Sequence, residues 1–358
     1  LIRQQPLTRS NALMEVILPL GVVAGLVGWG SHLLFSPAPV KEQRALTVAL
    51  IQPNIPQTTI WDPEKSIQRF QQIMVLSEQA LETAHPELVV WPEAAVPSLF
   101  LWDTNVAYRG QTIYGAITSL ARRHQIWMVI GADDAEARRD DSGEADYYNS
   151  SFLITPEGRV AATYRKQQLV IFGEYVPLSR WLPFLKDFTQ VYGEFARGKG
   201  PVTFSLPDLK VNTSVLICFE DTFAHLARKH VTPDVDFLLN LTNNGWFGES
   251  AAQWQHAANA VFRAVENGLP LIRASNNGLS CWVDPRGRMH QVYFPGSSNV
   301  YQAGFKFAEV PLPDQQGRAM TFYNQHGDWF GWSCVGVTLL ALVTSEIKSR
   351  RIKSGKTV

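Results

Sequence analysis

Three short segments place a reactive side chain at or just after the end of an apolar, strand-like run. They are LVVWPEAAVP with Glu93, TYRKQQLVIFGEYVPL with Lys166 and Glu174, and SVLICFED with Cys218. Folds of the α/β class commonly carry their functional groups at strand ends. A thiol nucleophile needs a base, and acyl transfer needs a positive donor where the tetrahedral oxyanion forms. Glu93, Cys218 and Lys166 supply these roles and predict a thiol-dependent acyl-transfer site.

Each of these residues has an ordinary structural explanation when it is taken alone. A cysteine after several apolar residues is more often a buried core thiol than a nucleophile. Glu93 could assist a helix start or be solvated, and Lys166 could be a surface lysine. The joint pattern favours catalysis, because base, oxyanion donor and nucleophile occur together.

Composition and charge exclude several other classes of protein. A content of 46% hydrophobic and 18% charged residues is that of a folded chain. The 32 Lys and Arg balance the 32 Asp and Glu, so no basic field exists to hold nucleic acid. The cysteines and histidines lack disulfide or metal-ligand spacing, so we predict no metal and no cofactor. The residues given no catalytic role are Cys281, Cys334, His225, His230, His256 and the Asn-X-Ser/Thr triplets at Asn149, Asn212 and Asn240, which lie in predicted strands.

Between the chain ends, strand-like and helical patterns alternate, which predicts an α/β layered domain. Apolar spacing predicts helices over 63–84 and 250–266. Gly/Pro/Asp punctuation at 155–159 and 284–288 predicts hairpin turns. The predicted buried strands are 46–51, 87–91, 126–132, 149–155, 212–219, 235–242, 269–275 and 279–284.

Two uncharged apolar runs lie near the ends. The run within 16–36 is long enough to cross a hydrocarbon core of roughly 30 Å, with a buried core helix or a signal peptide as alternatives. The run 329–345 opens with aromatic residues placed like an interfacial belt, and a buried helix is its alternative. We therefore predict an N-terminal segment 1–44, a catalytic domain 45–313 and a C-terminal segment 314–358, with a membrane helix in each terminal segment.

Flanking charge predicts the orientation of these helices. Arg3 and Arg9 precede the first run, and five Lys and Arg residues between Lys348 and Lys356 follow the second. The positive-inside rule then places both termini in the cytoplasm and the catalytic domain on the other side. A solvated basic tail without topological meaning is the alternative.

Several motifs considered together resemble a known family. The chain is similar to the nitrilase superfamily of carbon–nitrogen hydrolases and, within it, to the bacterial apolipoprotein N-acyltransferases. The resemblance runs from about Leu46 to the C-terminal span. The motifs that carry it are LTVALIQPNIPQ (46–57), WPEAAVP (91–97), YRKQQLVIFGEYVPL (164–178), ICFED (217–221), LTNNGWFG (241–248), FRAVENGLPLIRASNNGLS (262–280) and TFYNQHGDWF (321–330).

This resemblance implies an αββα four-layer sandwich and a catalytic triad of Glu93, Lys166 and Cys218, with Glu174 as a second carboxylate beside the lysine. The family pattern commonly has Pro, Tyr and Asp where this chain has Ile171, Phe219 and Asn244. The family also carries several membrane helices before the catalytic domain. The chain starts at Leu1, so either such helices are missing or the chain is a shortened relative.

The implied activity is transfer of a fatty acyl group from a phospholipid, through a Cys218 thioester, to the amino group of a diacylglyceryl-cysteine on an apolipoprotein. A membrane-tethered amidase or nitrilase that uses water as acceptor is the alternative. The implied location is the bacterial inner membrane, with the catalytic domain in the periplasm. Glu220 is expected near the thiol or as a cap of the turn. The aromatic residues expected to line a lipid approach, or else to pack the core, are Trp61, Phe219, Trp246 and Phe247.

Overall fold

The computed structural model describes residues 13–36, 44–60, 62–102, 107–138, 143–179, 181, 182, 184, 194–312 and 319–353. The chain divides into two units, Leu1–Glu42 and Gln43–Val358. Each unit is described by itself. The second unit contains both six-stranded sheets and every predicted catalytic residue.

The first sheet has six strands and a parallel centre. β1, β2 and β5 are parallel neighbours, whereas β14 and β6 pair antiparallel to β1 and β5. In sheet order the strands are β14 (Gly304–Pro311), β1 (Ala45–Gln52), β2 (Leu88–Val90), β5 (Trp127–Ala137), β6 (Ala145–Ile154) and β7 (Val160–Arg165).

The second sheet also has six strands, and β9, β10 and β11 form its parallel centre. Its edges are antiparallel. In sheet order the strands are β13 (Met289–His290), β12 (Cys281–Val283), β11 (Leu271–Ser275), β10 (Phe237–Thr242), β9 (Val211–Ile217) and β8 (Thr203–Leu206).

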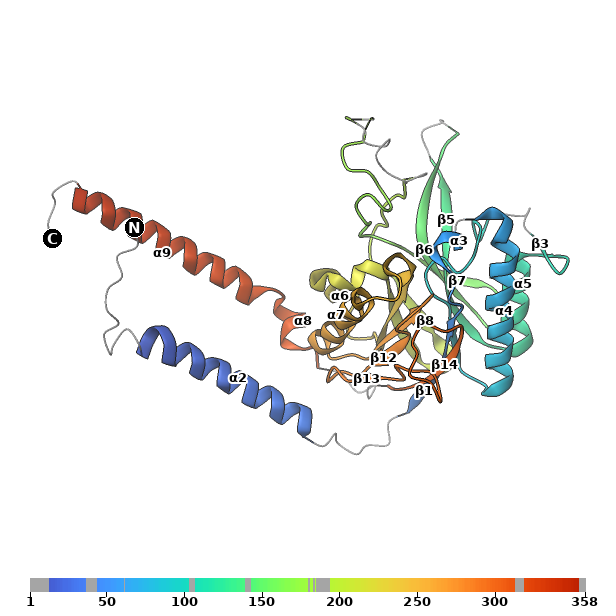
Figure 1. The fold of residues 1–358 in the computed structure, drawn as a ribbon, viewed down its shortest axis with the longest axis horizontal. Coiled ribbons are helices and arrows are strands. Elements are labelled where there is room, and N and C mark those ends of the chain that lie inside the picture. Colours follow the sequence, from blue (N-terminus) through green and yellow to red (C-terminus); the bar gives the residue numbers. More distant parts are fainter. Residues whose placement is uncertain are drawn as a thin grey trace. The chain divides into compact units, whose positions relative to one another are not determined.

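Side chains from both sheets form one buried cluster between them. Val48 and Val90 of the first sheet belong to the same cluster as Val215 and Leu239 of the second. Because strand side chains alternate between faces, the opposite faces are left to the helices. α4 (Ser66–Thr83) and α5 (Ile113–His124) share a second cluster with the first sheet, and α7 (Ala251–Asn267) shares a third with the second sheet. The labels in Figure 1 locate α4 and α5 beside one another.

The remaining elements are short. Two of them, η5 and η6, directly follow strands of the second sheet and carry predicted site residues. The elements are α3 (Gln57–Ile60), η2 (Pro63–Lys65), β3 (Ala107–Tyr108), β4 (Gln111–Thr112), η4 (Pro207–Leu209), η5 (Cys218–Thr222), α6 (Ala224–Lys229), η6 (Asn244–Phe247) and α8 (Phe322–His326).

Both apolar runs are helical. A π-helical turn over Leu13–Ile17 leads into α2 (Leu18–Phe35), and α9 covers Trp329–Lys353. Windows at Met14–Phe35 and Trp329–Arg350 are long and apolar enough to span a membrane, and neither is buried within the protein. Neither window is therefore the buried core helix considered as an alternative.

The predicted α/β class is confirmed, and all eight predicted strands are present within one to five residues of their expected bounds. The predicted helix 63–84 is a 3₁₀ turn followed by α4, because Pro63 and the Asp62 cap begin the helix tightly. The turns at 155–159 and 284–288 do connect hairpins, β6 to β7 and β12 to β13.

Candidate active site

The three predicted catalytic residues all follow strands. Glu93 lies in the loop after β2, and Lys166 is the first residue after β7 in the same sheet. Cys218 follows β9 of the second sheet and begins η5. All three side chains are at least nine-tenths buried, although two of them are charged groups. Buried charges require partners, so their contacts define the site.

Lys166 is the centre of these contacts. Its Nζ donates to Glu93 Oε1 at 3.2 Å and to Glu174 Oε1 at 2.7 Å. Burial by itself lowers the pKa of Lys166, but the charges of Glu93, Glu174 and Cys218 oppose it and raise the pKa above its ordinary value. The lysine is therefore a fixed ammonium at neutral pH.

Asn149 joins the two carboxylates. Its Nδ2 donates to Glu93 Oε1 at 2.8 Å and to Glu174 Oε1 at 3.0 Å. In the sequence Asn149 stands out only as the start of an Asn-X-Ser triplet, which gave no indication of these contacts. An asparagine within a strand does not by itself indicate a functional role. Its position here depends on how β6 pairs with β5 and β7.

Backbone amides hold the second oxygen of each carboxylate. Glu93 Oε2 accepts from the Asn243 backbone N–H at 2.8 Å, and Glu174 Oε2 accepts from that of Val170 at 2.8 Å. Asn243 follows β10 of the second sheet, so the Glu93 carboxylate bridges the two sheets. Hydrogen bonds to both oxygens fix the orientation of Glu93.

Cys218 has a left-handed backbone, with φ +50. A non-glycine residue in this region is uncommon, and such conformations gather at functional sites. Burial, followed by the charge of Glu93, raises the pKa of the thiol to about 12, against the opposing effect of Lys166. The thiol is therefore protonated at rest and requires a base to become a nucleophile.

The carbonyl of Cys218 is held from the second sheet. It accepts from Asn240 Nδ2 at 3.0 Å and lies 3.3 Å from His256 Nε2. His256 Nε2 also lies 3.0 Å from Asp221 Oδ1, and Asp221 pairs with Arg273 at 2.7 Å. Both neighbours of Nε2 are acceptors, so Nε2 carries the proton. Asn240 therefore helps to hold the backbone of Cys218, a role that its residue type and position in the sequence did not indicate.

Glu220 caps the turn after β9 and does more than cap it. It accepts from the Ile217 backbone N–H at 2.8 Å and from those of Gln167 and Gln168 at 2.7 and 3.0 Å. It also accepts from the Tyr164 hydroxyl at 2.8 Å. Glu220 thus connects the loop that carries Cys218 to the segment that follows Lys166.

Three of the four predicted approach aromatics can be located. Phe219 is 39% exposed, Trp246 60% and Phe247 43%, so these rings do not simply pack the core. Phe219 directly follows Cys218, and the other two lie in η6. Trp61 lies outside the described residues.

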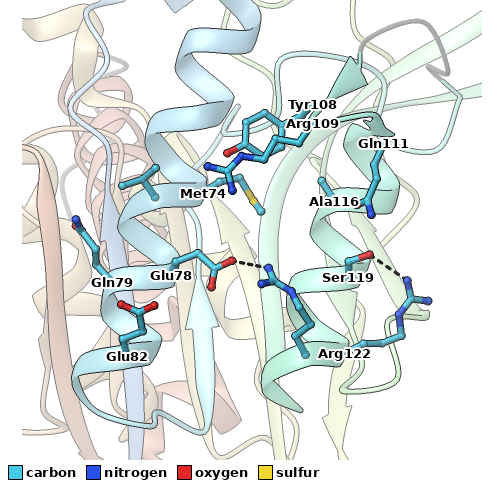
Figure 2. A pocket seen from close by; sticks show the side chains of 12 residues that line it. Met74, Glu78, Gln79, Glu82, Tyr108, Arg109, Gln111, Ala116, Ser119 and Arg122 are labelled. Carbon is cyan, nitrogen blue, oxygen red and sulfur yellow. Dashed lines mark hydrogen bonds and ion pairs between the residues drawn. The ribbon is translucent and has the colours of Figure 1, made fainter.

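A groove of about 700 Å³ between α4 and α5 is separate from these residues. Figure 2 shows Met74, Glu78 and Arg122 among the side chains that line it. Glu78 forms an ion pair with Arg123, which lines the same groove. None of the predicted catalytic residues lines this groove. Within the described residues, no group of three or more His, Cys, Asp and Glu side chains could hold a metal ion.

Comparison with known proteins defines the family. The carbon–nitrogen hydrolase family model matches residues 47–309, and the chain belongs to that family. An apolipoprotein N-acyltransferase from Geobacter metallireducens is 36% identical over 94% of this chain and 60% of its own length. One from Brucella melitensis is 32% identical over 88% of this chain and 56% of its own length. The chain thus spans less than two thirds of these relatives.

A solved structure agrees with this fold. The crystal structure of an amidase from Nesterenkonia sp. superposes with a TM-score of 0.52 and 19% identity, covering 82% of this chain and 100% of the amidase. The predicted nitrilase-like α/β fold is therefore confirmed.

Proposed function

We propose that this chain is the catalytic part of a membrane-bound N-acyltransferase that moves a fatty acyl group from a phospholipid to an apolipoprotein through a Cys218 thioester. The observation that carries the proposal is the buried Lys166 ammonium held between Glu93 and Glu174 and electrostatically coupled to Cys218. The names of the Geobacter and Brucella relatives support the acyltransferase activity.

In the first step, Glu93 takes the proton of the Cys218 thiol, and the thiolate attacks the ester carbonyl carbon of the phospholipid. Lys166 donates to the oxyanion that forms, which is the usual work of a preorganised positive donor. The C–O ester bond then breaks. The lysophospholipid leaves with the proton returned by Glu93, and the acyl group remains on sulfur.

In the second step, the α-amino group of a diacylglyceryl-cysteine attacks the thioester. A C–N bond forms, the C–S bond breaks, and Glu93 takes a proton from the attacking nitrogen. Transfer competes with hydrolysis, so water must be kept from the thioester. Water as acceptor would instead make the chain a hydrolase.

Exposed apolar side chains near Lys166 and Cys218 suit a lipid donor. Ile171 and Phe172 follow Lys166 and are exposed, as are Phe219 and Trp246 on the Cys218 side. Contiguous exposed apolar patches mark binding or membrane surfaces. We propose that these residues, with Trp61, form the approach for the acyl chains.

We also propose that α2 and α9 anchor the enzyme in the bacterial inner membrane, with residues 45–313 as its periplasmic catalytic domain. Their length and hydropathy support this assignment. The basic residues beyond each helix favour cytoplasmic ends. The clusters between the sheets and beneath the helices are those expected of an αββα four-layer sandwich.

Intact-protein mass spectrometry after mixing the purified chain with phosphatidylglycerol tests the proposal. We expect a mass increase of one fatty acyl group that maps to Cys218 and disappears when a diacylglyceryl-cysteine peptide is added, with acylated peptide as product. Loss of the adduct to free fatty acid, without peptide acylation, would support the hydrolase instead. No adduct on any cysteine would refute the thioester mechanism.

A further inference from the structure

Asp133 of β5 lies beside the catalytic carboxylates, although no sequence motif drew attention to it. Asp133 pairs directly with Asn149 of β6. Directly opposed residues in an antiparallel pair project to the same face of the sheet, with Cβ atoms about 4.5–5.5 Å apart. Asn149 contacts Glu93 and Glu174 on that face. The Asp133 carboxyl therefore projects toward the same site.

Gly131 gives independent support for this placement. It lies two residues before Asp133, so both residues have the same facing in the strand. A Cβ built on Gly131 would lie 2.3 Å from the Pro92 carbonyl oxygen and 2.7 Å from the Glu93 Cα. The loop that carries Glu93 therefore crosses the face to which Asp133 projects.

Asp133 also lines a small cavity. Ala94, the residue after Glu93, lines the same cavity of about 120 Å³, as do Ser66 and Arg69 of α4. At about 30 Å³ for each water, this volume suits a small polar group and is far too small for an acyl chain. Arg69 is 7% exposed, and its Nε has no hydrogen-bond partner within the described part of the chain.

The charges around the cavity favour a cation near Asp133. Glu93, Glu174 and Asp133 face one ammonium, that of Lys166, while Arg69 donates to the carbonyls of Ile60 and Asp62. Burial, followed by the charges of Glu93 and Glu174, raises the pKa of Asp133 to about 7, and Lys166 opposes this rise. A carboxyl with such a pKa exchanges protons readily near neutral pH.

We propose that the cavity at Asp133 receives the α-ammonium group of the acceptor and that Asp133 takes its first proton. The inference rests on the proposed acyltransferase function and names the group that prepares its second substrate. An α-amino group has an ordinary pKa of about 7.7–8.0, so much of it arrives protonated and cannot attack. Arg69 Nε offers a donor to the carbonyl oxygen of the same N-terminal residue.

The proton balance of this step is complete. The ammonium gives one proton to Asp133 and becomes an amine, which attacks the thioester carbon and forms the C–N bond. The C–S bond breaks and Cys218 leaves as thiolate. Glu93 takes the second proton from nitrogen and returns it to sulfur, the third remains on the amide, and Asp133 releases its proton to solvent.

A phospholipid headgroup could supply the same ammonium chemistry. The amine of phosphatidylethanolamine is several bonds away from the ester carbon that Cys218 attacks. The acceptor nitrogen, in contrast, must come within bonding distance of the thioester. The position of Asp133 beside Glu93 therefore favours the acceptor.

The test separates the two half-reactions in the 358-residue chain. Asp133→Asn is compared with the control variant Asp146→Asn. Asp146 lies on β6 of the same sheet, and its carboxylate forms a surface ion pair with Arg138. Each variant is acylated in separate reactions with phosphatidylglycerol and with phosphatidylethanolamine, and lysophospholipid release is timed in each. A diacylglyceryl-cysteine peptide or hydroxylamine, an amine that is uncharged at neutral pH, is then added, and thioester decay is followed by intact mass.

We expect Asp133→Asn to acylate normally with both lipids, to react normally with hydroxylamine, and to transfer to the peptide about 10-fold more slowly at pH 7, because only about a tenth of an α-amino group with this pKa is free amine there. The difference in transfer rate between Asp133→Asn and the unmodified chain should decrease toward pH 9, because more of the peptide amine is then unprotonated. A purely structural defect would not depend on pH in this way. Asp146→Asn should match the unmodified chain throughout.

Three results would overturn the inference. They are normal transfer by Asp133→Asn, an equal defect with hydroxylamine, and a defect in acylation by phosphatidylethanolamine alone, which would assign the cavity to the headgroup. Failure of the unmodified chain to form any thioester would instead remove the proposed function, and this inference with it.

Discussion

Replacing Glu93 with glutamine should slow acyl transfer by about 10²–10⁴ while making the Cys218 thiol more reactive toward a small alkylating agent. The substitution keeps the size of the side chain and removes its charge. Glu93 Oε1 accepts from Lys166 and Asn149, and Oε2 accepts from the Asn243 backbone N–H. The amide oxygen of glutamine can accept a hydrogen bond at one of these two positions, but its NH₂ group, which is a donor, faces another donor at the second position. One such mismatch costs about 1–3 kcal/mol, which a domain stable by about 5–15 kcal/mol tolerates.

The two assays should move in opposite directions because Glu93 has opposite effects on them. Its charge raises the pKa of Cys218, while Lys166 lowers it. Without that charge the thiol pKa falls, and each unit of decrease raises the thiolate fraction at pH 8 about tenfold. Acyl transfer also needs the base, whose loss costs about 10²–10⁴ in rate, or roughly 2.7–5.5 kcal/mol.

Iodoacetamide labelling with peptide mapping follows Cys218, and lysophospholipid release follows the chemistry. Glu87→Gln is the matched control, because the Glu87 carboxylate pairs with Arg44 away from the thiol. A parallel loss of labelling and release would mean that Glu93 holds the shape of the site without acting as the base. Normal release would remove Glu93 from the mechanism altogether.

Three further predictions concern the lysine, the thiol and the topology. Lys166→Arg should lose about 2–4 kcal/mol of transition-state stabilisation with folding intact, because the planar guanidinium presents its donors differently; near-normal turnover would reduce the lysine to a structural charge. Cys218→Ala and Cys218→Ser should release no lysophospholipid while Cys281→Ala, at a buried strand position, should retain release; the reverse pattern would identify the wrong cysteine. Alkaline phosphatase should be active when fused after Val40 and inactive when fused after Lys356, and an inverted pattern would contradict the periplasmic assignment.

The strands buried on both faces could be predicted because their apolar runs are continuous. Six strands in the described part of the chain were missed. β3, β4 and β13 are only two residues long, and β7, β8 and β14 lie at sheet edges, where buried and exposed residues mix or alternate. A search for alternation would have detected β8, whose pattern is strict. α5 was missed as well, although Ile113, Ile117 and Leu120 recur on one buried face at helical spacing.

The reactive residues could be predicted, but their supports could not. Ionisable and nucleophilic residues such as Glu93, Lys166 and Cys218 stand out at the ends of apolar strands, so their residue types indicate a functional site. Asn149 and Asp133 lie within strands, where a single polar residue does not indicate a functional site. They lie at the site because β5 and β6 pair in one particular register. A shift of one residue in the β5–β6 pairing would place Asn149 and Asp133 on opposite faces of the sheet, so the register of this pairing, which could not be predicted, decides their roles.

The second sheet sets the geometry of the nucleophile through a network of buried side chains. A left-handed cysteine costs about 1–3 kcal/mol and persists only where its surroundings hold it. Asn240 of β10 and His256 of α7 hold the Cys218 carbonyl, and Arg273 of β11 fixes both Asn240 and Asp221 at 2.7 Å. Breaking a buried ion pair such as Arg273–Asp221 costs about 3–5 kcal/mol, more than the strain it supports. The position of the thiol relative to Glu93 and Lys166 therefore depends on β9, β10 and β11 of the second sheet and on α7. The same hydrogen bonds and ion pair explain how Cys218 keeps its left-handed backbone conformation.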